Sequence, residues 1–238
     1  MERLDKFLCD SGAGTRSQVK LILRAGRVQV DGAPEKDGGR KIDPAKNEIT
    51  LDGVRLAGKH RAVFMMNKPE GYVTATEDAR EKTVMELLPA QLRHLELKPV
   101  GRLDKATEGL LLFTNDGELM QRLIHPKYEV DKLYRVTVRG DWEKGVPLLR
   151  QMRVLEREPI APAQVELLCA EDGCAVLHMT IHQGKNRQIR RMCRQAGLTV
   201  LRLERLAEHG VLLGNLPCGK WRALTDEEVK MLKGCEEK

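Results

Sequence analysis

An apolar run at positions 110–113, Leu-Leu-Leu-Phe, directly follows a charged loop at positions 101–109 that has glycine at both ends. Such a run is typical of a strand buried on both faces, and a buried strand requires a sheet and covering layers around it. The loop carries one carboxylate, Asp104, which an anchored strand would hold in place. Taken alone, an Asp in a glycine-rich loop is more often a turn or cap residue than a catalytic group.

The composition favours a globular protein of one large domain, or of a small module joined to a larger one. The chain has 238 residues, of which 41% are hydrophobic, so it can bury a core. No apolar run approaches the roughly eighteen residues that a transmembrane helix requires. The N-terminus has no apolar signal segment, so we expect a cytoplasmic protein. Neither a heptad repeat nor a large apolar stripe indicates a dimer, and we expect a monomer.

Cysteine and histidine spacing argues against a metal site. The six cysteines form no C-x-x-C pair, so we expect free and mostly buried thiols, without disulfides or zinc. His178 and His182 lie four residues apart but lack an obvious third ligand.

The net charge of +6 is compatible with nucleic-acid binding, but many proteins that bind no nucleic acid have a similar charge. An aromatic content of 3% argues against a sheet that stacks several bases of a single strand.

Positions 1–58 predict a small basic α/β module. A helix is expected over positions 3–12, and a second follows Thr15, which has capping-box spacing to Gln18. A short strand at 27–30 meets the turn Asp31-Gly32, and a hairpin is expected around Asp52-Gly53. The polar stretch 57–61 is typical of a linker, so we expect the module at 1–58 and a larger domain at 59–238.

The second predicted helix carries a stripe of cations. Arg16, Lys20 and Arg24 recur at i, i+4 and i+8, and Arg27 follows just beyond the helix. For an arbitrary helix, a solvated face is the commoner explanation. Here the charges are of one sign and continue into a strand, an arrangement that can follow a phosphate backbone.

From position 62 onward strands outnumber helices, which predicts an α+β domain with a mixed, largely antiparallel sheet and flanking helices. Strands are expected at 63–66, 72–74, 110–113, 134–138, 165–169 and 175–181. Helices are expected at 83–88, at 118–124 behind an Asn115 or Asp116 cap, and from about Asn186.

A second charged centre lies at 185–194, where five of ten residues are basic and none is acidic. Lys185, Arg187, Arg190 and Arg191 would surround the start of the predicted helix, which is a favourable place for an anion. A merely soluble basic helix is the alternative. Lys68, in the turn K-P-E-G, could contact a phosphate or only solvate the turn, and we include it among the expected phosphate contacts.

Four stretches occur in a fixed order: K-P-E-G-Y, G-R-L-D-K-A-T-E-G-L-L-L-F-T-N-D-G, K-L-Y-R-V and G-K-N-R-Q-I-R-R-M. Together they resemble the RsuA family of pseudouridine synthases, which modify ribosomal RNA, over essentially the whole chain. The pattern at 2–55 resembles the small RNA-binding domain named after the fourth small-subunit ribosomal protein. The resemblance implies an isomerase with an N-terminal RNA-binding module and a catalytic domain.

The resemblance also implies roles for individual residues. Asp104 would be the essential carboxylate, Tyr134 the aromatic that packs on the target base, and Arg190 the basic partner of Asp104. Arg102 would contact RNA or order the loop. The reaction joins carbon 5 of uracil to the ribose in place of nitrogen 1, so we expect neither a metal nor an organic cofactor. Whether Asp104 attacks the base, attacks the sugar or removes a sugar proton is open, and we favour the last two.

The expected partner is ribosomal RNA or a pre-ribosomal particle. The stretch K-P-E-G-Y-V-T-A-T-E-D is similar to members acting on 16S rRNA, whereas N-R-Q-I-R-R-M is closer to relatives acting on 23S rRNA. We expect a 16S site, with a 23S site as the alternative. The motifs favour two further functions less strongly, a non-catalytic RNA-binding assembly factor and a tRNA-directed synthase.

Overall fold

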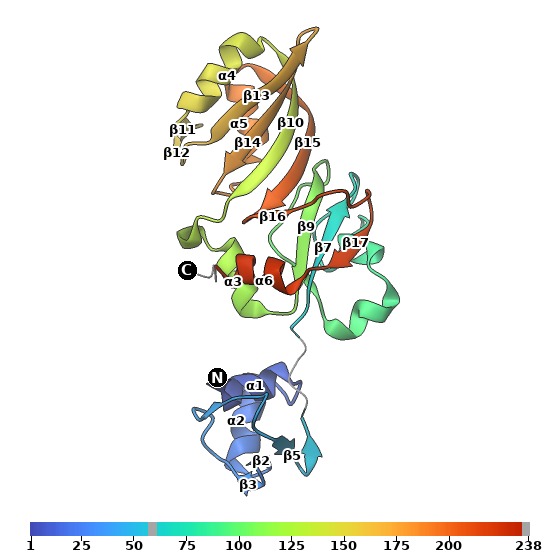
Figure 1. Ribbon diagram of the computed structural model, residues 1–238, viewed down its shortest axis with the longest axis vertical. Helices are drawn as coiled ribbons and strands as arrows, with labels where there is room; N and C mark the ends of the chain where they lie inside the picture. Colours follow the sequence, from blue (N-terminus) through green and yellow to red (C-terminus); the bar gives the residue numbers. More distant parts are fainter. Residues whose placement is uncertain (57–60, 235–238) are drawn as a thin grey trace. The chain divides into compact units, whose positions relative to one another are not determined.

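The computed structural model describes residues 1–56 and 61–234, and their side chains except those of residues 93 and 94. The chain divides into two compact units, residues 1–60 and 61–238 (Figure 1). The domain boundary predicted after residue 58, and most of the predicted linker, lie outside the described residues. Within the described part of the chain, no helix is long and apolar enough to cross a membrane.

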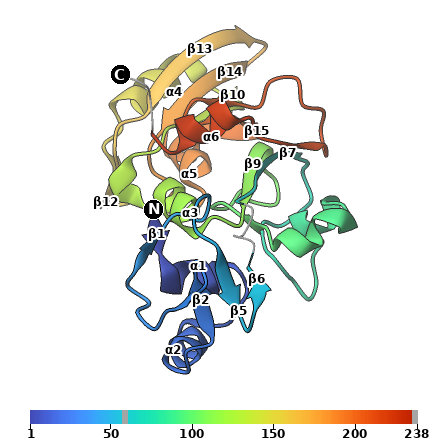
Figure 2. The ribbon, with the colours of Figure 1, turned by 60° about the horizontal axis from the view of Figure 1, so that its bottom comes forward.

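The first unit contains two helices and two small sheets (Figure 2). Its four-stranded sheet has the order β3-β2-β5-β6, and β1 pairs with β4. The elements are α1 (Leu4–Asp10), α2 (Arg16–Arg24), β1 (Glu2–Arg3), β2 (Val28–Val30), β3 (Ala33–Pro34), β4 (Lys41–Ile42), β5 (Ile49–Leu51) and β6 (Val54–Arg55).

Local sequence signals account for most of these elements. The predicted capping box is confirmed: the Gln18 backbone N–H donates to the Thr15 hydroxyl at 3.4 Å, and the Thr15 N–H donates to the Gln18 side chain at 2.8 Å. The hairpin turn between β5 and β6 has Asp52 and Gly53 at φ values of 52° and 79°. Apolar faces of both helices and of β2 and β5 close a separate small core.

The second unit is built on a nine-stranded sheet with the order β13-β14-β10-β15-β9-β7-β17, to which β16 and β8 add at β15 and β9. Every pair is antiparallel except β15–β9, so the prediction of a mixed, largely antiparallel sheet is confirmed. The strands are β7 (Val63–Lys68), β8 (Lys98–Pro99), β9 (Glu108–Thr114), β10 (Lys132–Gly140), β13 (Gln164–Glu171), β14 (Cys174–Ile181), β15 (Leu198–Glu208), β16 (Val211–Leu212) and β17 (Trp221–Ala223).

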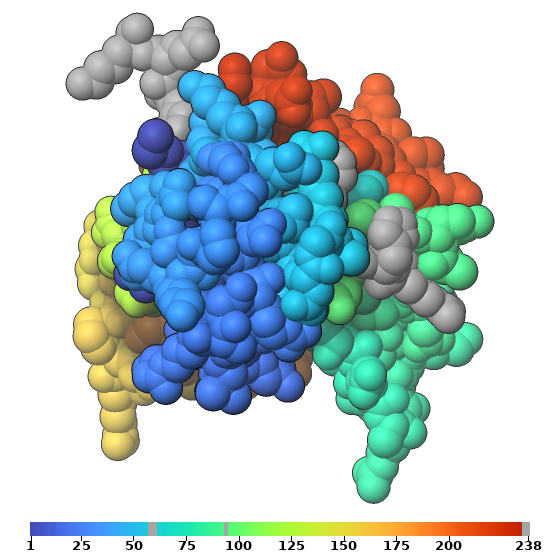
Figure 3. All heavy atoms as spheres, turned by 90° about the horizontal axis from the view of Figure 1, so that it is seen from below, coloured from blue at the N-terminus to red at the C-terminus, as the bar shows by residue number. Residues whose placement is uncertain are grey.

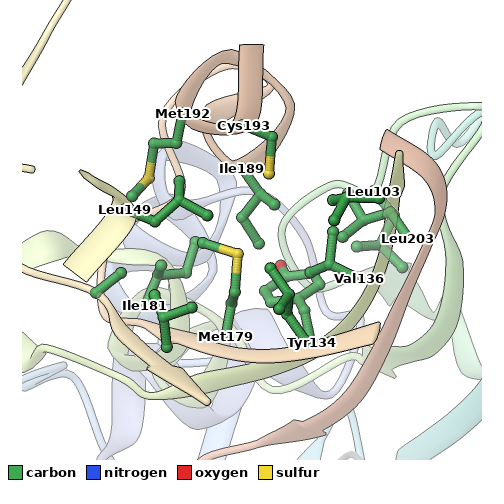
Figure 4. Packing of buried hydrophobic residues seen from close by; sticks show 14 of the residues in the cluster. Leu103, Tyr134, Val136, Leu149, Met179, Ile181, Ile189, Met192, Cys193 and Leu203 are labelled. Carbon is green, nitrogen blue, oxygen red and sulfur yellow. The ribbon is translucent and has the colours of Figure 1, made fainter. Parts of the chain in front are cut away.

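Helices and a small hairpin complete this unit. They are α3 (Gly117–Ile124), α4 (Trp142–Gln151), α5 (Gln188–Gln195), α6 (Asp226–Leu232), the 3-10 helices η1 (Val84–Leu87), η2 (Ala90–Leu95) and η3 (Pro126–Tyr128), and the hairpin β11 (Val154–Leu155) with β12 (Glu158–Pro159). The apolar side of α5 packs on the sheet, and Figure 4 shows Ile189, Met192 and Cys193 facing Met179 of β14 and Tyr134 of β10.

Two expectations were wrong in detail, and one helix was not expected. No strand forms at 72–74; Val73 makes only an isolated bridge to Thr83, and the segment instead bonds to the loop of Asp104. Helix α4 was not predicted, because its Gly145 and Pro147 are poor helix formers. Of the five cysteines in the described residues, only Cys193 is buried.

Candidate active site

The loop of Asp104 is a closed turn held by backbone bonds. The Thr107 N–H donates to the Asp104 carbonyl at 2.9 Å, and the chain then enters β9. Thr74 is buried and bonds the loop twice, because its hydroxyl donates to the Leu103 carbonyl at 2.8 Å and accepts from the Leu103 N–H at 3.2 Å. The Gly71 N–H donates to the Lys105 carbonyl at 2.9 Å. The segment after K-P-E-G therefore supports the loop directly.

Lys68 lies beneath this loop, with its side chain fully buried. Its ammonium donates to the carbonyls of Pro69 at 3.0 Å, Asp104 at 3.3 Å, Lys105 at 3.4 Å and Thr107 at 2.9 Å. The prediction that Lys68 contacts RNA is wrong, because its charge is turned inward and used by the loop. Burial lowers the pKa of Lys68 to about 8, and the charge of Asp104 opposes that shift.

Asp104 and Tyr134 line the same cavity, whose volume is about 410 Å³. Its apolar lining includes Leu103, Ile181 and Leu203. Three of the predicted RNA-binding cations also line it: Arg102, Lys185 and Arg187. The cavity therefore combines a carboxylate, an aromatic ring, an apolar lining and a basic rim, which suits an uncharged planar group attached to an anionic chain.

Tyr134 projects from the middle of the sheet, where β10 pairs with Met179 of β14 and Arg205 of β15. The side chain is 8% exposed. Burial raises the pKa of Tyr134, and the neighbouring Arg205 charge acts in the opposite direction. The phenol is thus protonated at neutral pH, and the residue offers an apolar ring rather than a phenolate.

A buried ionic cluster behind Tyr134 was missed by the sequence reasoning. Arg205 donates from Nε to the Leu110 carbonyl at 2.7 Å, and its guanidinium lies 3.2 Å from the Glu208 carboxylate. Glu208 also lies 3.7 Å from the Lys132 ammonium. The available signal was the alternation at positions 201–208, L-R-L-E-R-L-A-E, which puts Arg205 on the same strand face as Leu203 and Ala207.

Arg190 lies beside the Asp104 loop but does not form the expected ion pair among the described residues. Its guanidinium donates to the Ala106 carbonyl at 2.6 Å, and its buried Nε has no hydrogen-bond partner. Burial lowers the pKa of Arg190, and the charge of Asp104 opposes that shift. Arg190 therefore holds the backbone of the loop and keeps one donor free.

Most of the other cations at 185–194 form ion pairs, although that stretch of sequence contains no acidic residue. The hairpin β11–β12 supplies Glu156, which pairs with Arg191 at 2.8 Å and also with Arg194. Its Glu158 pairs with Lys185 at 3.1 Å. Arg187, directly before the first residue of the helix, has a φ of 48°, in the left-handed region. Acids distant in sequence thus pair with three of the five cations at 185–194.

In the first unit, the predicted stripe is present on α2. Arg16, Lys20 and Arg24 are all exposed, while the apolar face of the helix is buried. Arg27 differs from them because its guanidinium makes a bidentate pair with Asp52. Figure 3 shows the surface of this unit in blue.

Comparison with known proteins finds a matching family for each of the two units. Residues 62–195 match the family model described as RNA pseudouridylate synthase, and residues 2–47 match the S4 domain. The uncharacterized RNA pseudouridine synthase YtzG of Bacillus subtilis is 39% identical, over 97% of this chain and 98% of its own length. The ribosomal large subunit pseudouridine synthase B of the same organism is 34% identical, over 98% and 96%. A crystal structure of a pseudouridylate synthase aligns with a TM-score of 0.65 at 31% identity, covering 98% of this chain and 100% of that one.

Proposed function

This chain belongs to the RNA pseudouridylate synthase family, in its S4-domain branch, and we propose that it isomerises a uridine of ribosomal RNA in the cavity beside Asp104. The observation that carries the proposal is that Asp104 and Tyr134, from distant parts of the chain, line one cavity with three cations at its rim. A binding module without chemistry has no need of a carboxylate among cations that meet a polyanion, because that charge weakens phosphate binding.

The proposed reaction uses few groups. The bond between nitrogen 1 of uracil and the ribose breaks, the detached base turns, and carbon 5 bonds to the same ribose carbon. Carbon 5 then loses its proton, and nitrogen 1 gains one. Asp104 acts on the sugar, either by attack or by removing a proton, and Tyr134 supports the uracil face, a type of contact worth about 1–3 kcal/mol per base.

The target must leave the RNA stack to reach Asp104, at a cost of a few kcal/mol. Arg102 and Arg187 at the rim, and the α2 stripe of the S4 domain, offset this cost through phosphate contacts. Arg190 is the positioning group: it orders the loop through Ala106, and its free Nε is a donor for Asp104 or the substrate.

Asp104→Asn tests the assignment. We expect loss of tritium release from ribosomal RNA that carries uridine tritiated at carbon 5, with RNA affinity within about threefold of wild type because the cations are unchanged. Asp226→Asn, on the exposed start of α6, makes the same change away from the cavity and should keep full activity. Full activity in Asp104→Asn would contradict the proposed role.

For the target we propose 16S rRNA, on the basis of the stretch K-P-E-G-Y-V-T-A-T-E-D. A 23S site is the second candidate, because a relative that is 34% identical is named for the large subunit. Pseudouridine maps of both rRNAs from wild-type and deletion cells separate the two: one position should disappear from 16S rRNA. A loss confined to 23S rRNA would reverse the order, and no loss in either would contradict both.

A further inference from the structure

An exposed aromatic ends η3, the short 3-10 helix that follows α3. Ile124, the last residue of α3, lines the cavity, and Tyr128 ends η3 four residues later. Tyr128 is 39% exposed. All the Phe, Tyr and Trp residues of the chain lie in the described part, and Tyr128 is the only exposed one among them. The mechanism above does not use it.

Cations surround the Tyr128 ring. The Arg122 guanidinium carbon lies 5.1 Å from the ring centroid and the Lys127 ammonium 4.6 Å from it. The His125 ring packs edge-on at 6.2 Å, and its Nδ1 accepts a bond from the Lys127 N–H at 3.2 Å, which fixes its orientation. Arg122 is half-buried, whereas the Lys127 side chain is exposed.

The backbone presents this ring at some cost. Glu129, directly after Tyr128, has a φ of 46°, a left-handed conformation that is unfavourable for residues other than glycine. Glu129 closes η3 in this conformation, and its N–H donates to the Pro126 carbonyl at 3.1 Å, which fixes the backbone directly after the ring.

We propose that Tyr128, with Arg122 and Lys127, is a stacking platform for a nucleobase adjacent to the uridine that enters the cavity. The inference rests on the proposed function, because a uridine that leaves the stack deprives its neighbour of a stacking partner. The Tyr128 ring replaces that partner, and the two cations contact the phosphates on either side.

The test measures binding of the full-length protein to two fluorescent probes of equal charge. One is an oligoadenylate of about twelve nucleotides, and the other is the same ribose-phosphate chain without bases. The S4 unit does not contribute stacking from its described residues, because its one Phe, Tyr or Trp residue is Phe7, which is buried. A preference for the base-bearing probe therefore reports on the second unit.

Tyr128→Ala should weaken binding of the base-bearing probe about fivefold or more, the equivalent of about 1 kcal/mol, and change binding of the baseless probe less than about twofold. Tyr128→Phe keeps the ring and should bind both probes like wild type. Lys127→Ala should weaken both probes equally. Leu148→Ala, an exposed apolar residue on α4, is the control and should change neither.

Equal losses on both probes for Tyr128→Ala, or no loss on either, would overturn the platform. A Tyr128→Leu variant that binds like wild type would also overturn it, since an apolar side chain without a ring cannot stack. Because neither probe is turned over, these outcomes do not depend on catalysis. Failure of the Asp104→Asn experiment and failure of this one are therefore distinguishable.

Discussion

Lys68 connects two motifs that look independent in the sequence, K-P-E-G-Y and the Asp104 loop. A cation that bonds several carbonyls of one turn fixes the turn more firmly than any single backbone bond, because each carbonyl is polarised toward the same point. The same arrangement explains why a buried lysine is tolerated: the carbonyls replace part of its hydration. At the residue scale, the position of Asp104 thus depends on a charge that is buried beneath its loop.

Replacing Lys68 by Met should lower kcat on the order of a hundredfold, because a catalytic group displaced by about an ångström loses that much. KM should change little, since the rim cations remain. The measurement is steady-state tritium release, with Lys230→Met on the exposed side of α6 as a matched control. A variant in which KM alone rises would indicate an RNA contact after all.

The same variant has a stability signature. The pKa of Lys68 is about 8 in the folded protein against an ordinary value of 10.5, so between these pH values the folded state has lost a proton that the unfolded state keeps. Unfolding then takes up a proton, and the free energy of unfolding rises with pH across this interval. We expect the free energy of unfolding of wild type, minus that of Lys68→Met, to increase from pH 8 to 10.5 in urea titrations. A flat difference would contradict the shifted pKa.

At the scale of elements, the parallel contact of β9 with β15 joins the strands of the Asp104 loop and of Arg205. This contact is short, with Glu108 opposite Glu204 and Gly109 opposite Arg205. Gly109 has a φ of 99°, and a Cβ there would lie 2.3 Å from the Arg205 carbonyl oxygen. The sheet can therefore continue from one half to the other only if this position is glycine.

Gly109→Ala should destabilise the second unit by about 3 kcal/mol, from backbone strain together with the steric clash. Gly173→Ala is the matched control, because Gly173 also has a positive φ but meets nothing within 4 Å. It should cost only about 1 kcal/mol. Trp142 and Trp221 both lie in the second unit, so urea unfolding followed by tryptophan fluorescence reports on that unit. Equal losses in the two variants would show that the close approach is unimportant.

At the scale of the whole molecule, each unit has its own set of cations that can bind RNA phosphates. In the second unit, Glu156 and Glu158 pair with three of the cations at 185–194, whereas Arg102 and Arg187 line the cavity. In the first unit, the α2 stripe is exposed. Two modest binding surfaces on one chain reinforce each other by raising the effective concentration of each for the same RNA.

Replacing Arg16, Lys20 and Arg24 together by Ala should reduce the slope of log affinity against log salt by about 2–3, as expected for three lost phosphate contacts. The kcat at saturating RNA should not change, because the cavity is untouched. Replacing Lys41, Lys46 and Arg55, which are exposed on other elements of the same unit, removes the same charge. An equal change in slope from this control would mean that net charge, and not the stripe, binds the RNA.

The sequence by itself determined the features that depend on near neighbours: the Thr15 capping box, the Asp-Gly hairpins, the buried strand after Asp104 and the motifs of the family. Tertiary structure alone decided where the long charged side chains point. Lys68 turned into the loop, Arg191 paired with Glu156, and Arg205 reached the Leu110 carbonyl. The physical reason is one of range: caps and turns satisfy backbone groups a few residues away, whereas a flexible cation pairs with whichever anion or carbonyl the fold brings within reach.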